Sequence, residues 1–199
     1  MNIFVTGADT NVGKTVVSAW LCLHTNANYW KPIQTGNDSD KNVVAKLSPY
    51  TKIIPEIYKL KAPLSPYDAS KLEGIEIDRN LFGIDVHNTV IEGAGGILVP
   101  IAKNFLMVDL IKTCEAKVLI VAKSKLGMIN HLLMTSEVLR SRAIDILGIA
   151  INGKIENNLK NTIEEFSRLK ILSVIPQSED LVGTLQSKTL PPEFLEVLK

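Results

Sequence analysis

The segment that most constrains the fold of this chain is a turn rich in small and polar residues between an apolar run and a helical stretch. Its residues read Gly7-Ala8-Asp9-Thr10-Asn11-Val12-Gly13-Lys14-Thr15, after the run Ile3–Thr6 and before Val16–His24. Glycines let successive backbone N–H groups turn toward one anion, and the positive end of the following helix faces the same anion. Lys14 adds a mobile cation for phosphate oxygens, and the Thr15 hydroxyl can bind Mg²⁺. The sequence therefore predicts a strand, a phosphate-binding loop and a helix.

Short apolar runs alternate along the whole chain with longer stretches of helical period. They are rich in Val and Ile and lie at Ile3–Thr6, Asn28–Lys31, Val86–Ile91, Lys117–Ala122, Ile146–Ile151 and Ile171–Ile175. Strands that are apolar on both faces are covered by helices on each side, and right-handed crossovers then give a doubly wound sheet. We predict an α/β fold, with a mostly parallel sheet and helices on both faces, in one domain of residues 1–199. Prolines between Pro49 and Asp85 predict loops and short helices in that region.

The charge and hydropathy of the sequence argue against several classes of protein. The chain has 22 Lys and Arg against 21 Asp and Glu, a net charge of +1, which leaves no basic excess for the phosphates of a polynucleotide. No apolar run approaches the ~18 residues of a membrane helix, and the N-terminus lacks the pattern of a secretory signal. We therefore expect a cytoplasmic protein whose partners include no nucleic acid and no membrane. Cys22 and Cys114 lack the spacing of a disulfide framework or a zinc site and are expected to be buried apolar residues.

Charged side chains gather where the second and third predicted strands end. The third strand is followed by Glu92-Gly93-Ala94-Gly95-Gly96, and the second by Lys31-Pro32-Ile33-Gln34-Thr35-Gly36 with Asp38 and Asp40 beyond. Parallel α/β sheets bind ligands at the carboxyl ends of their strands, and a carboxylate there can orient Mg²⁺ on nucleotide phosphates. Alternatively, Glu92 is a loop or helix-capping residue, and Lys31 considered alone is a solvated strand-end lysine. The pattern as a whole favours a cation and carboxylates beside the phosphate loop.

Two further segments follow the fourth and fifth predicted strands. Lys123–His131 begins a helix that runs to about Arg142, and the N-terminus of this helix is a second candidate anion site. We interpret His131 as a helix-start residue with a satisfied ring, because no serine or cysteine nucleophile motif accompanies it. The amide of Asn152, in Asn152-Gly153-Lys154, could read a nucleotide base, although a turn-forming Asn-Gly pair explains the same residues.

Four of these segments, in this order, resemble motifs of the dethiobiotin synthetase family. Gly7–Thr15 is similar to the family's Gly-Thr-Asp-Thr-Glu-Val-Gly-Lys-Thr, including the five residues between the two glycines. Lys31–Gly36 resembles Lys-Pro-(x)-(x)-Ser/Thr-Gly, and Glu92–Gly96 reproduces Glu-Gly-Ala-Gly-Gly. Lys125–His131 resembles Lys-Leu-Gly-Cys-Ile-Asn-His, with Met128 in place of Cys. The first motif alone indicates only phosphate-loop ATPases, whereas the four together extend over most of the chain.

The resemblance implies a ring closure that depends on ATP and Mg²⁺, in which 7,8-diaminononanoate and CO₂ or bicarbonate give dethiobiotin, ADP and phosphate. It implies catalytic roles for Lys14, Lys31 and Thr10, and Mg²⁺ binding by Thr15, Asp40 and Glu92. The nucleotide-binding residues that it implies are Asp9, Thr10, Asn11, Val12, Gly13, Lys14, Thr15, Val16, Asn152 and Pro176. The substrate-binding residues that it implies are Thr35, Gly95, Gly127, Met128, Ile129 and Asn130.

The resemblance also implies a homodimer, in which the helix start at Gly127–His131 binds the carboxylate tail of substrate in the site of the partner subunit. The chain departs from the family pattern at Asn11, which replaces an acidic residue, and at Asn152-Gly153-Lys154, where Asn-Asp is common. The segment after Pro176 has no obvious match to the base-binding region of the family. We therefore predict weak discrimination between ATP and other nucleoside triphosphates, with GTP accepted as well.

Two other functions are compatible with a phosphate loop. One is that of a partitioning or metal-insertion ATPase, which acts on a protein partner, and the other is that of a non-catalytic nucleotide-binding module. Proteins of the first kind favour an additional lysine early in the loop, where this chain has Ala8, Asp9, Thr10, Asn11 and Val12. The loop sequence therefore argues against a partitioning ATPase.

Overall fold

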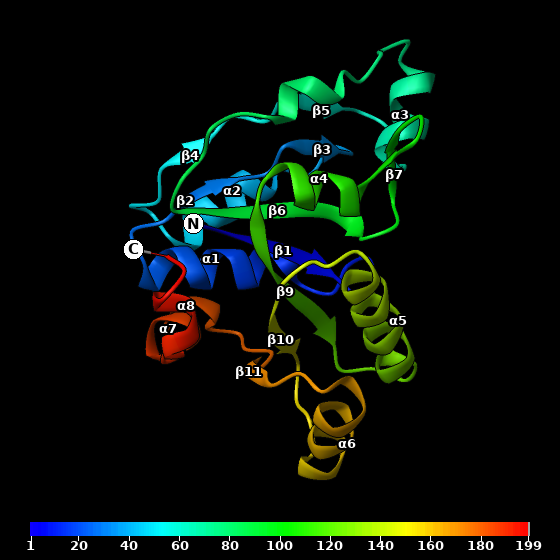
Figure 1. Cartoon of the computed structure of the whole chain (residues 1–199). Coiled ribbons are helices and arrows are strands. Elements are labelled where there is room, and N and C mark those ends of the chain that lie inside the picture. The colour runs from blue at the N-terminus through cyan, green and yellow to red at the C-terminus, as the bar shows by residue number, and fades with distance from the viewer. Residues whose placement is uncertain (199) are drawn as a thin grey trace.

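The computed structural model describes residues 1–198 of the chain, and its centre is a sheet of seven strands in the order β11-β10-β9-β1-β6-β2-β4 (Figure 1). All the neighbouring strands in this sheet pair in parallel. The strands are β1 (Asn2–Gly7), β2 (Asn28–Trp30), β4 (Ile53–Ile54), β6 (Thr89–Gly96), β9 (Ala116–Lys123), β10 (Ile146–Asn152) and β11 (Ile171–Ile175). Successive crossovers run to both sides of β1, so the predicted doubly wound parallel sheet is confirmed.

Helices cover both faces of this sheet. The helices of the chain are α1 (Lys14–His24), α2 (Asp40–Leu47), α3 (Pro66–Leu72), α4 (Met107–Thr113), α5 (Met128–Ser141), α6 (Asn157–Ser167), α7 (Leu181–Ser187) and α8 (Pro192–Leu195), with a 3-10 turn at Arg79–Phe82, and α3 packs on the small sheets described below. In Figure 1, α1, α7 and α8 lie on one side of the sheet, and α4 and α5 lie on the other. Two small two-stranded sheets lie outside the central one, β3 (Ile33–Thr35) with β5 (Tyr58–Leu60) and β7 (Pro100–Ala102) with β8 (Phe105–Leu106).

The alternation of side chains along β1 shows why the strand is apolar on both faces. Ile3 and Val5 belong to a core cluster that includes residues of α1, α2, α7 and α8, whereas Phe4 belongs to a cluster that includes residues of α4, α5 and α6. Successive side chains of a strand point to opposite faces, so a strand between two helical layers must be apolar at every position. The two clusters are therefore the two layers of core that the sheet separates.

The largest correction to the predicted elements concerns the third core strand. We expected Val86–Ile91, but β6 spans Thr89–Gly96, so Glu92 lies inside the strand and not after its end. The glycines of Gly93–Gly96 continue the parallel pairing with β1 as far as the Gly7–Gly96 pair, after a shift of register. Residues with little side chain can extend a strand beyond its apolar run, which the pattern of Val and Ile alone does not show.

The region between Pro49 and Asp85 is only partly as expected. It contains α3 and the 3-10 turn, in line with the predicted short helices, but also the strands β4 and β5, which were not predicted. Strand β4 has two residues and β5 has three, too few for an alternating pattern to be recognised. The strand β4 nevertheless forms the edge of the central sheet beside β2.

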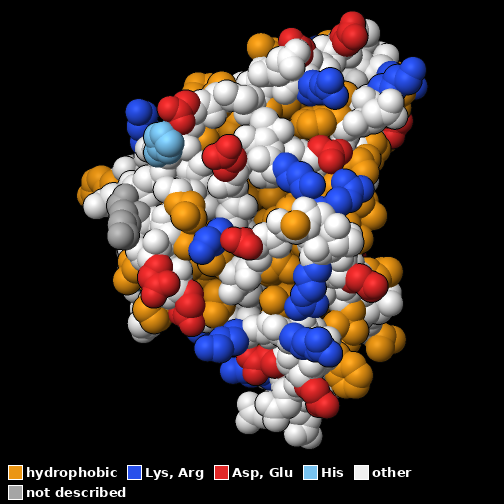
Figure 2. Space-filling view, viewed as in Figure 1, with side chains coloured by type: hydrophobic (Ala, Val, Ile, Leu, Met, Phe, Trp, Pro, Cys, Tyr) orange, Lys and Arg blue, Asp and Glu red, His pale blue; other side chains and the backbone are white. Residues whose placement is uncertain are grey.

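The surface agrees with the near balance of charges in the sequence. Figure 2 shows Lys and Arg side chains interspersed with Asp and Glu over the visible face. Within residues 1–198, no helix has both the length and the apolar character needed to cross a membrane. Cys22 and Cys114 are buried and free, as expected.

Candidate active site

The candidate site is a cavity of about 450 Å³ beside the carboxyl ends of β1, β2 and β6. It brings together most of the residues that the sequence assigns to nucleotide, metal and substrate. Those that line the cavity are Thr10, Asn11, Gly13, Lys14, Thr15, Val16, Lys31, Thr35, Asp40, Glu92 and Gly95. Segments from three separate parts of the sequence therefore meet at one place.

The loop after β1 has the backbone conformation that its glycines predict. Gly13 is the N-cap of α1 with a φ of 92°, and Asn11 has a φ of 55°. Both angles lie in the left-handed region, which glycine enters freely and asparagine tolerates. The carbonyl of Gly13 accepts the first helical hydrogen bond from the Val17 N–H at 3.1 Å. The positive end of α1 therefore faces the cavity, as a phosphate-binding loop requires.

Lys14 curls back over this loop. A side-chain carbon built on Gly7 would lie 3.1 Å from Lys14 Nζ, so the ammonium lies close to the start of the loop. Lys14 is 8% exposed, and burial lowers the pKa of its ammonium, an effect that the nearby Glu92 carboxylate offsets in part. A buried cation without a full complement of anions is costly, and a bound phosphate would supply the missing negative charge.

Lys31 is buried at the centre of an ion-pair cluster. Its ammonium contacts Asp40 Oδ2 and lies 3.3 Å from Glu92 Oε1, and the residue is 7% exposed. Burial alone would lower the pKa of Lys31, but the Glu92 and Asp40 carboxylates hold it above its ordinary value. Burial likewise would raise the pKa of Asp40, but Lys31 holds it below its ordinary value. The alternative of a solvated strand-end lysine is therefore wrong, because the chain folds Lys31 inward onto two carboxylates.

Two carboxylates lie beside the Thr15 hydroxyl, at the position where the sequence predicts Mg²⁺ binding. Thr15 Oγ1 donates to Glu92 Oε1 at 2.9 Å and lies 3.1 Å from Asp40 Oδ1. No group of three or more His, Cys, Asp or Glu side chains suited to a metal occurs within residues 1–198. Mg²⁺ is commonly held by one or two carboxylates together with the phosphates of the substrate, so one hydroxyl and two carboxylates fit this ion. The alternative that Glu92 is a loop or helix-capping residue is also wrong, because Glu92 lies inside β6 and is 1% exposed.

Asp9 points away from this cavity, into a neighbouring one of about 440 Å³ that Thr10 also lines. Its carboxylate accepts from Lys125 Nζ and from the Thr10 N–H, each at 2.7 Å, and the Lys125 hydrogen bond is the main cause of its lowered pKa. His131 Nδ1 lies 3.7 Å from Asp9 Oδ2, which is too far for a hydrogen bond, and it has no other partner in the described residues. The expected satisfied ring of His131 is therefore not observed.

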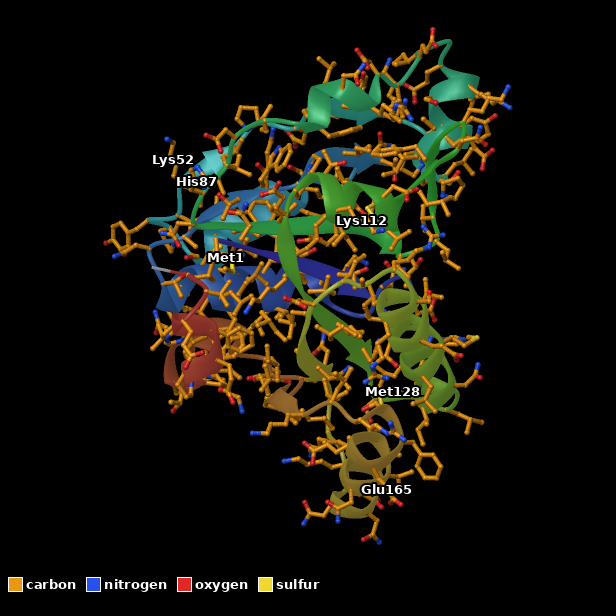
Figure 3. The ribbon with its side chains drawn as sticks, in the orientation of Figure 1. Met1, Lys52, His87, Lys112, Met128 and Glu165 are labelled. Atoms are coloured by element: carbon orange, nitrogen blue, oxygen red, sulfur yellow. The ribbon has the colours of Figure 1, made fainter. Side chains whose placement is uncertain are left out.

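Several predicted site residues lie outside the cavity. Val12 is buried, and Asn152 Nδ2 donates to the Val12 carbonyl at 3.3 Å, so this amide packs against the phosphate loop. Pro176 follows β11 and does not line the cavity. The same holds for Gly127, Met128, Ile129 and Asn130 at the start of α5. Figure 3 labels Met128 on this helix, and the residue is buried. Within one subunit, Asn152 therefore lies against the phosphate loop, whereas Pro176 and the start of α5 do not reach its cavity.

The structure adds residues that the sequence did not assign to the site. Gln34, Asp38, Val43 and Ala94 also line the cavity. Tyr29 does not line it, but its hydroxyl reaches Glu92 from the neighbouring strand β2 at 3.0 Å. The signal for Gln34 and Asp38 was their position beside Lys31. An aromatic residue within an apolar run gives no comparable signal, because such residues usually belong to the core.

A larger cavity, of about 810 Å³, lies elsewhere. Its lining includes Lys71, Asp78, Arg79 and Lys103 and none of the residues of the phosphate loop. Volume alone would favour this cavity as a binding site. The smaller cavity is the candidate active site because it holds the helix N-terminus, the two buried lysines and the buried carboxylate.

The fold and the loop together define the class of protein: a nucleotide-binding protein with a phosphate loop after the first strand of a parallel sheet. In agreement, residues 1–184 match the AAA domain family. The ATP-dependent dethiobiotin synthetase BioD of Lawsonia intracellularis is 45% identical over 193 residues, which cover 96% of this chain and 93% of that protein. The corresponding protein of Paramagnetospirillum magneticum is 43% identical, with 96% of each chain covered. The chain therefore belongs to the ATP-dependent dethiobiotin synthetase family, and the resemblance of the four motifs is confirmed.

Solved structures with a similar fold are more distant in sequence. The cell division ATPase MinD of Pyrococcus furiosus has a TM-score of 0.59 at 13% identity, with 99% of this chain and 96% of that chain covered. A ParA family ATPase of Chlorobium tepidum has a TM-score of 0.52 at 16% identity, with 98% and 92% covered. At these identities the similarity shows a shared fold and nothing about a shared partner.

Proposed function

We propose that the protein catalyses the Mg²⁺-dependent conversion of 7,8-diaminononanoate, CO₂ and a nucleoside triphosphate to dethiobiotin, nucleoside diphosphate and phosphate. The observation that carries the proposal is the meeting of Lys14, Lys31 and Glu92 around one cavity beside the phosphate loop. This arrangement offers cations and a helix N-terminus to a set of negative oxygens, and it contains no serine or cysteine among its lining residues. A reaction that needs positioning and charge, but no enzyme nucleophile, suits such a site.

The proposed reaction has three steps whose atoms balance. One amine of the substrate adds to CO₂, loses a proton and becomes a carbamate. A carbamate oxygen then attacks the γ-phosphorus, and the bond between this phosphorus and the oxygen that bridges to the β-phosphate breaks. The nucleoside diphosphate is the leaving group, and the product is a carbamic-phosphoric anhydride. The second amine attacks the carbonyl carbon, loses a proton and expels phosphate, which closes the ureido ring.

Each cation in the site has a place in this sequence of steps. Lys14, over the loop, would bind the β and γ phosphates, and Lys31 would meet the negative charge of the carbamate and of the transferred phosphoryl group. Thr10 and Thr35, which both line the cavity, would donate hydrogen bonds to the carbamate and phosphate oxygens. Gly95 lines the cavity with a φ of 71°, which glycine adopts freely, and its lack of a side chain would let the backbone approach a substrate closely.

Thr15, Asp40 and Glu92 are the residues that would hold Mg²⁺. When bound, the ion offsets negative charge on the phosphate oxygens. In the structure, the Lys31 ammonium forms ion pairs with the Asp40 and Glu92 carboxylates. When Mg²⁺ binds these carboxylates, the ammonium would be released from them and would move toward the substrate. The binding of metal and the placement of the catalytic lysine are thus coupled through two shared anions.

A partitioning ATPase is the alternative to be tested, although the fold that it shares with this chain does not by itself indicate that function. Phosphate release that requires both diaminononanoate and bicarbonate distinguishes the synthetase from such an ATPase and from a non-catalytic module. We expect no release above background when either compound is omitted. Release that is unaffected by the diamine would favour the partitioning ATPase.

We propose that the protein discriminates weakly between nucleotide bases, so that GTP and CTP are substrates as well as ATP. Asn152 donates its amide to the Val12 carbonyl, and the exposed Asp180 carboxylate caps α7 by accepting from the Gly183 N–H at 2.9 Å. Side chains that already form hydrogen bonds with backbone groups are poorly placed to form specific hydrogen bonds with one particular base. We expect competition titrations of ATP, GTP and CTP to give affinities within about tenfold of one another. A hundredfold preference for ATP would contradict this proposal.

We propose that the active unit is a homodimer with shared sites. The start of α5 lies outside the cavity of its own subunit, Leu126 before it is fully exposed, and Gly127 caps the helix with a φ of 89°. A helix N-terminus of this kind can bind a substrate carboxylate across an interface. We expect that mixing a Lys14→Ala chain with a Gly127→Phe chain restores activity, because each heterodimer then contains one intact site. Heterodimers that form without any recovery of activity would exclude a shared site.

We also propose that residues 1–199 form a single domain and that the protein acts in the cytoplasm. One sheet separates both core clusters, which supports a single folding unit. The substrates are small and charged, which supports a location where nucleoside triphosphates are available.

A further inference from the structure

A buried hydroxyl on β2 contacts the carboxylate that is proposed to bind Mg²⁺. Tyr29 has no exposed surface, and its hydroxyl donates to Glu92 Oε2 at 3.0 Å. The other oxygen, Glu92 Oε1, accepts from Thr15 Oγ1 at 2.9 Å and from Lys31 Nζ at 3.3 Å. Each oxygen of this carboxylate thus has its own donors, with Tyr29 on the side away from Thr15 and Lys31.

The register of the sheet explains how Tyr29 reaches Glu92. Tyr29 pairs with Val90 of the neighbouring strand β6, and Glu92 lies two residues beyond Val90. Alternate residues of a strand share one face, so Tyr29, Val90 and Glu92 all point to the face that α1 covers. The length of a phenol ring carries its hydroxyl along this face to the carboxylate. The contact follows from the backbone and needs no special loop conformation.

The chemistry of this hydroxyl distinguishes it from an ordinary core residue. The Tyr29 hydroxyl faces a carboxylate oxygen, which can only accept a hydrogen bond, so the phenol is the donor. Within residues 1–198, Glu92 is its one hydrogen-bond partner. Phenylalanine would fill the same apolar space without a buried polar group, so the hydroxyl is accounted for by the carboxylate and not by packing. Tyr29 does not line the cavity and cannot touch the nucleotide.

We propose that Tyr29 is a positioning residue that fixes the Glu92 carboxylate, so that Oε1 is presented beside Thr15 to the Mg²⁺ of the bound nucleotide. The inference rests on the proposed function, because it requires that Glu92 bind this ion. Hydrogen bonds to the ligands of a metal orient those ligands, and their loss typically weakens metal binding about 10- to 100-fold.

The test compares ADP binding by the wild type and by Tyr29→Phe, with saturating Mg²⁺ and with EDTA, by titration calorimetry. We expect the wild type to bind ADP more tightly with Mg²⁺. We call the ratio of the ADP affinity with Mg²⁺ to the ADP affinity in EDTA the gain from Mg²⁺. In Tyr29→Phe this gain should fall about tenfold, whereas the affinity for ADP in EDTA should stay unchanged. Thermal unfolding of each variant checks that it is folded at the temperature of the titration.

Two further variants separate positioning from a general effect on the fold. Tyr58→Phe is the matched control, because the Tyr58 hydroxyl accepts from the Asp78 N–H at 2.8 Å and does not contact the site. It should keep the wild-type gain from Mg²⁺. Replacing Tyr29 by 4-aminophenylalanine retains an N–H donor at the same place and should restore most of the gain. In a Glu92→Gln background, Tyr29→Phe should add little, because the two residues act through one contact.

The outcomes distinguish this inference from the proposed function. If Mg²⁺ increases the affinity for ADP equally in the wild type and in Tyr29→Phe, the role of Tyr29 is overturned and the proposed function stands. An equal loss of ADP affinity with Mg²⁺ and with EDTA would show a structural role only and would also overturn it. If 4-aminophenylalanine fails to restore the gain in a folded protein, the hydrogen bond is not the cause. If the affinity of the wild type for ADP does not depend on Mg²⁺, both proposals are overturned.

Discussion

Replacing Lys14 by Ala is expected to reduce turnover by on the order of 10³-fold or more, because the triphosphate loses the cation that lies over its binding loop. The fold should survive, since Gly13 and the loop backbone are unchanged and a buried ammonium with a lowered pKa does not stabilise the empty protein. The measurement is ring-closing activity beside thermal unfolding. Lys46→Ala, which removes an exposed lysine of α2, is the control and should keep full activity.

Retention of ring-closing activity within tenfold of wild type in Lys14→Ala would contradict the assigned role. A loss of activity together with a loss of the folded state would instead show that Lys14 contributes to the structure. The unfolding measurement therefore has to accompany the kinetic one.

Replacing Lys31 by Ala is expected to lower kcat on the order of 10²–10³-fold with only a modest change in nucleotide affinity. Lys31 does not belong to the phosphate loop, and its ammonium is placed to meet charge that develops on the carbamate and on the transferred phosphoryl group. The variant also leaves the buried Glu92 carboxylate and the partly buried Asp40 carboxylate without their cation, so we expect a lower melting temperature that Mg²⁺ and ADP together raise.

Steady-state kinetics and a separate titration of nucleotide binding distinguish the two parts of this expectation. A Lys31→Ala protein that loses nucleotide affinity but keeps its turnover would place Lys31 in the nucleotide site and not at the reacting groups. Lys31→Arg is the informative companion variant, since it keeps the charge but not the position of the ammonium. Its activity should stay well below that of wild type if position matters.

Much of the fold could be predicted from the sequence because strands of a covered parallel sheet leave a strong local signal. The apolar runs at Ile3–Thr6 and Ile171–Ile175 lie within one residue of the observed bounds of β1 and β11. The phosphate loop was equally clear, since Gly13 must adopt a left-handed conformation that few residues other than glycine accept. These features depend on residues that are adjacent in the chain.

The features that the sequence did not reveal depend on residues far apart in the chain. The burial of Lys31 follows from its contacts with Asp40 and Glu92, and no local pattern predicts that a strand-end lysine folds inward. The contact of Tyr29 with Glu92 depends on β6 lying beside β2, which is known only once the strand order is known. Short strands such as β4 form because the neighbouring strand offers free hydrogen-bonding groups, not because of their own composition.

The most direct test of the proposed function follows the carbon atom of CO₂. The wild-type protein is incubated with ¹³C-bicarbonate, 7,8-diaminononanoate, ATP and Mg²⁺, and the products are examined by mass spectrometry beside a measurement of released phosphate. The account predicts dethiobiotin with one ¹³C in its ureido carbonyl and one phosphate released for each ring closed. Phosphate released without labelled dethiobiotin, or at the same rate without the diamine, would contradict it.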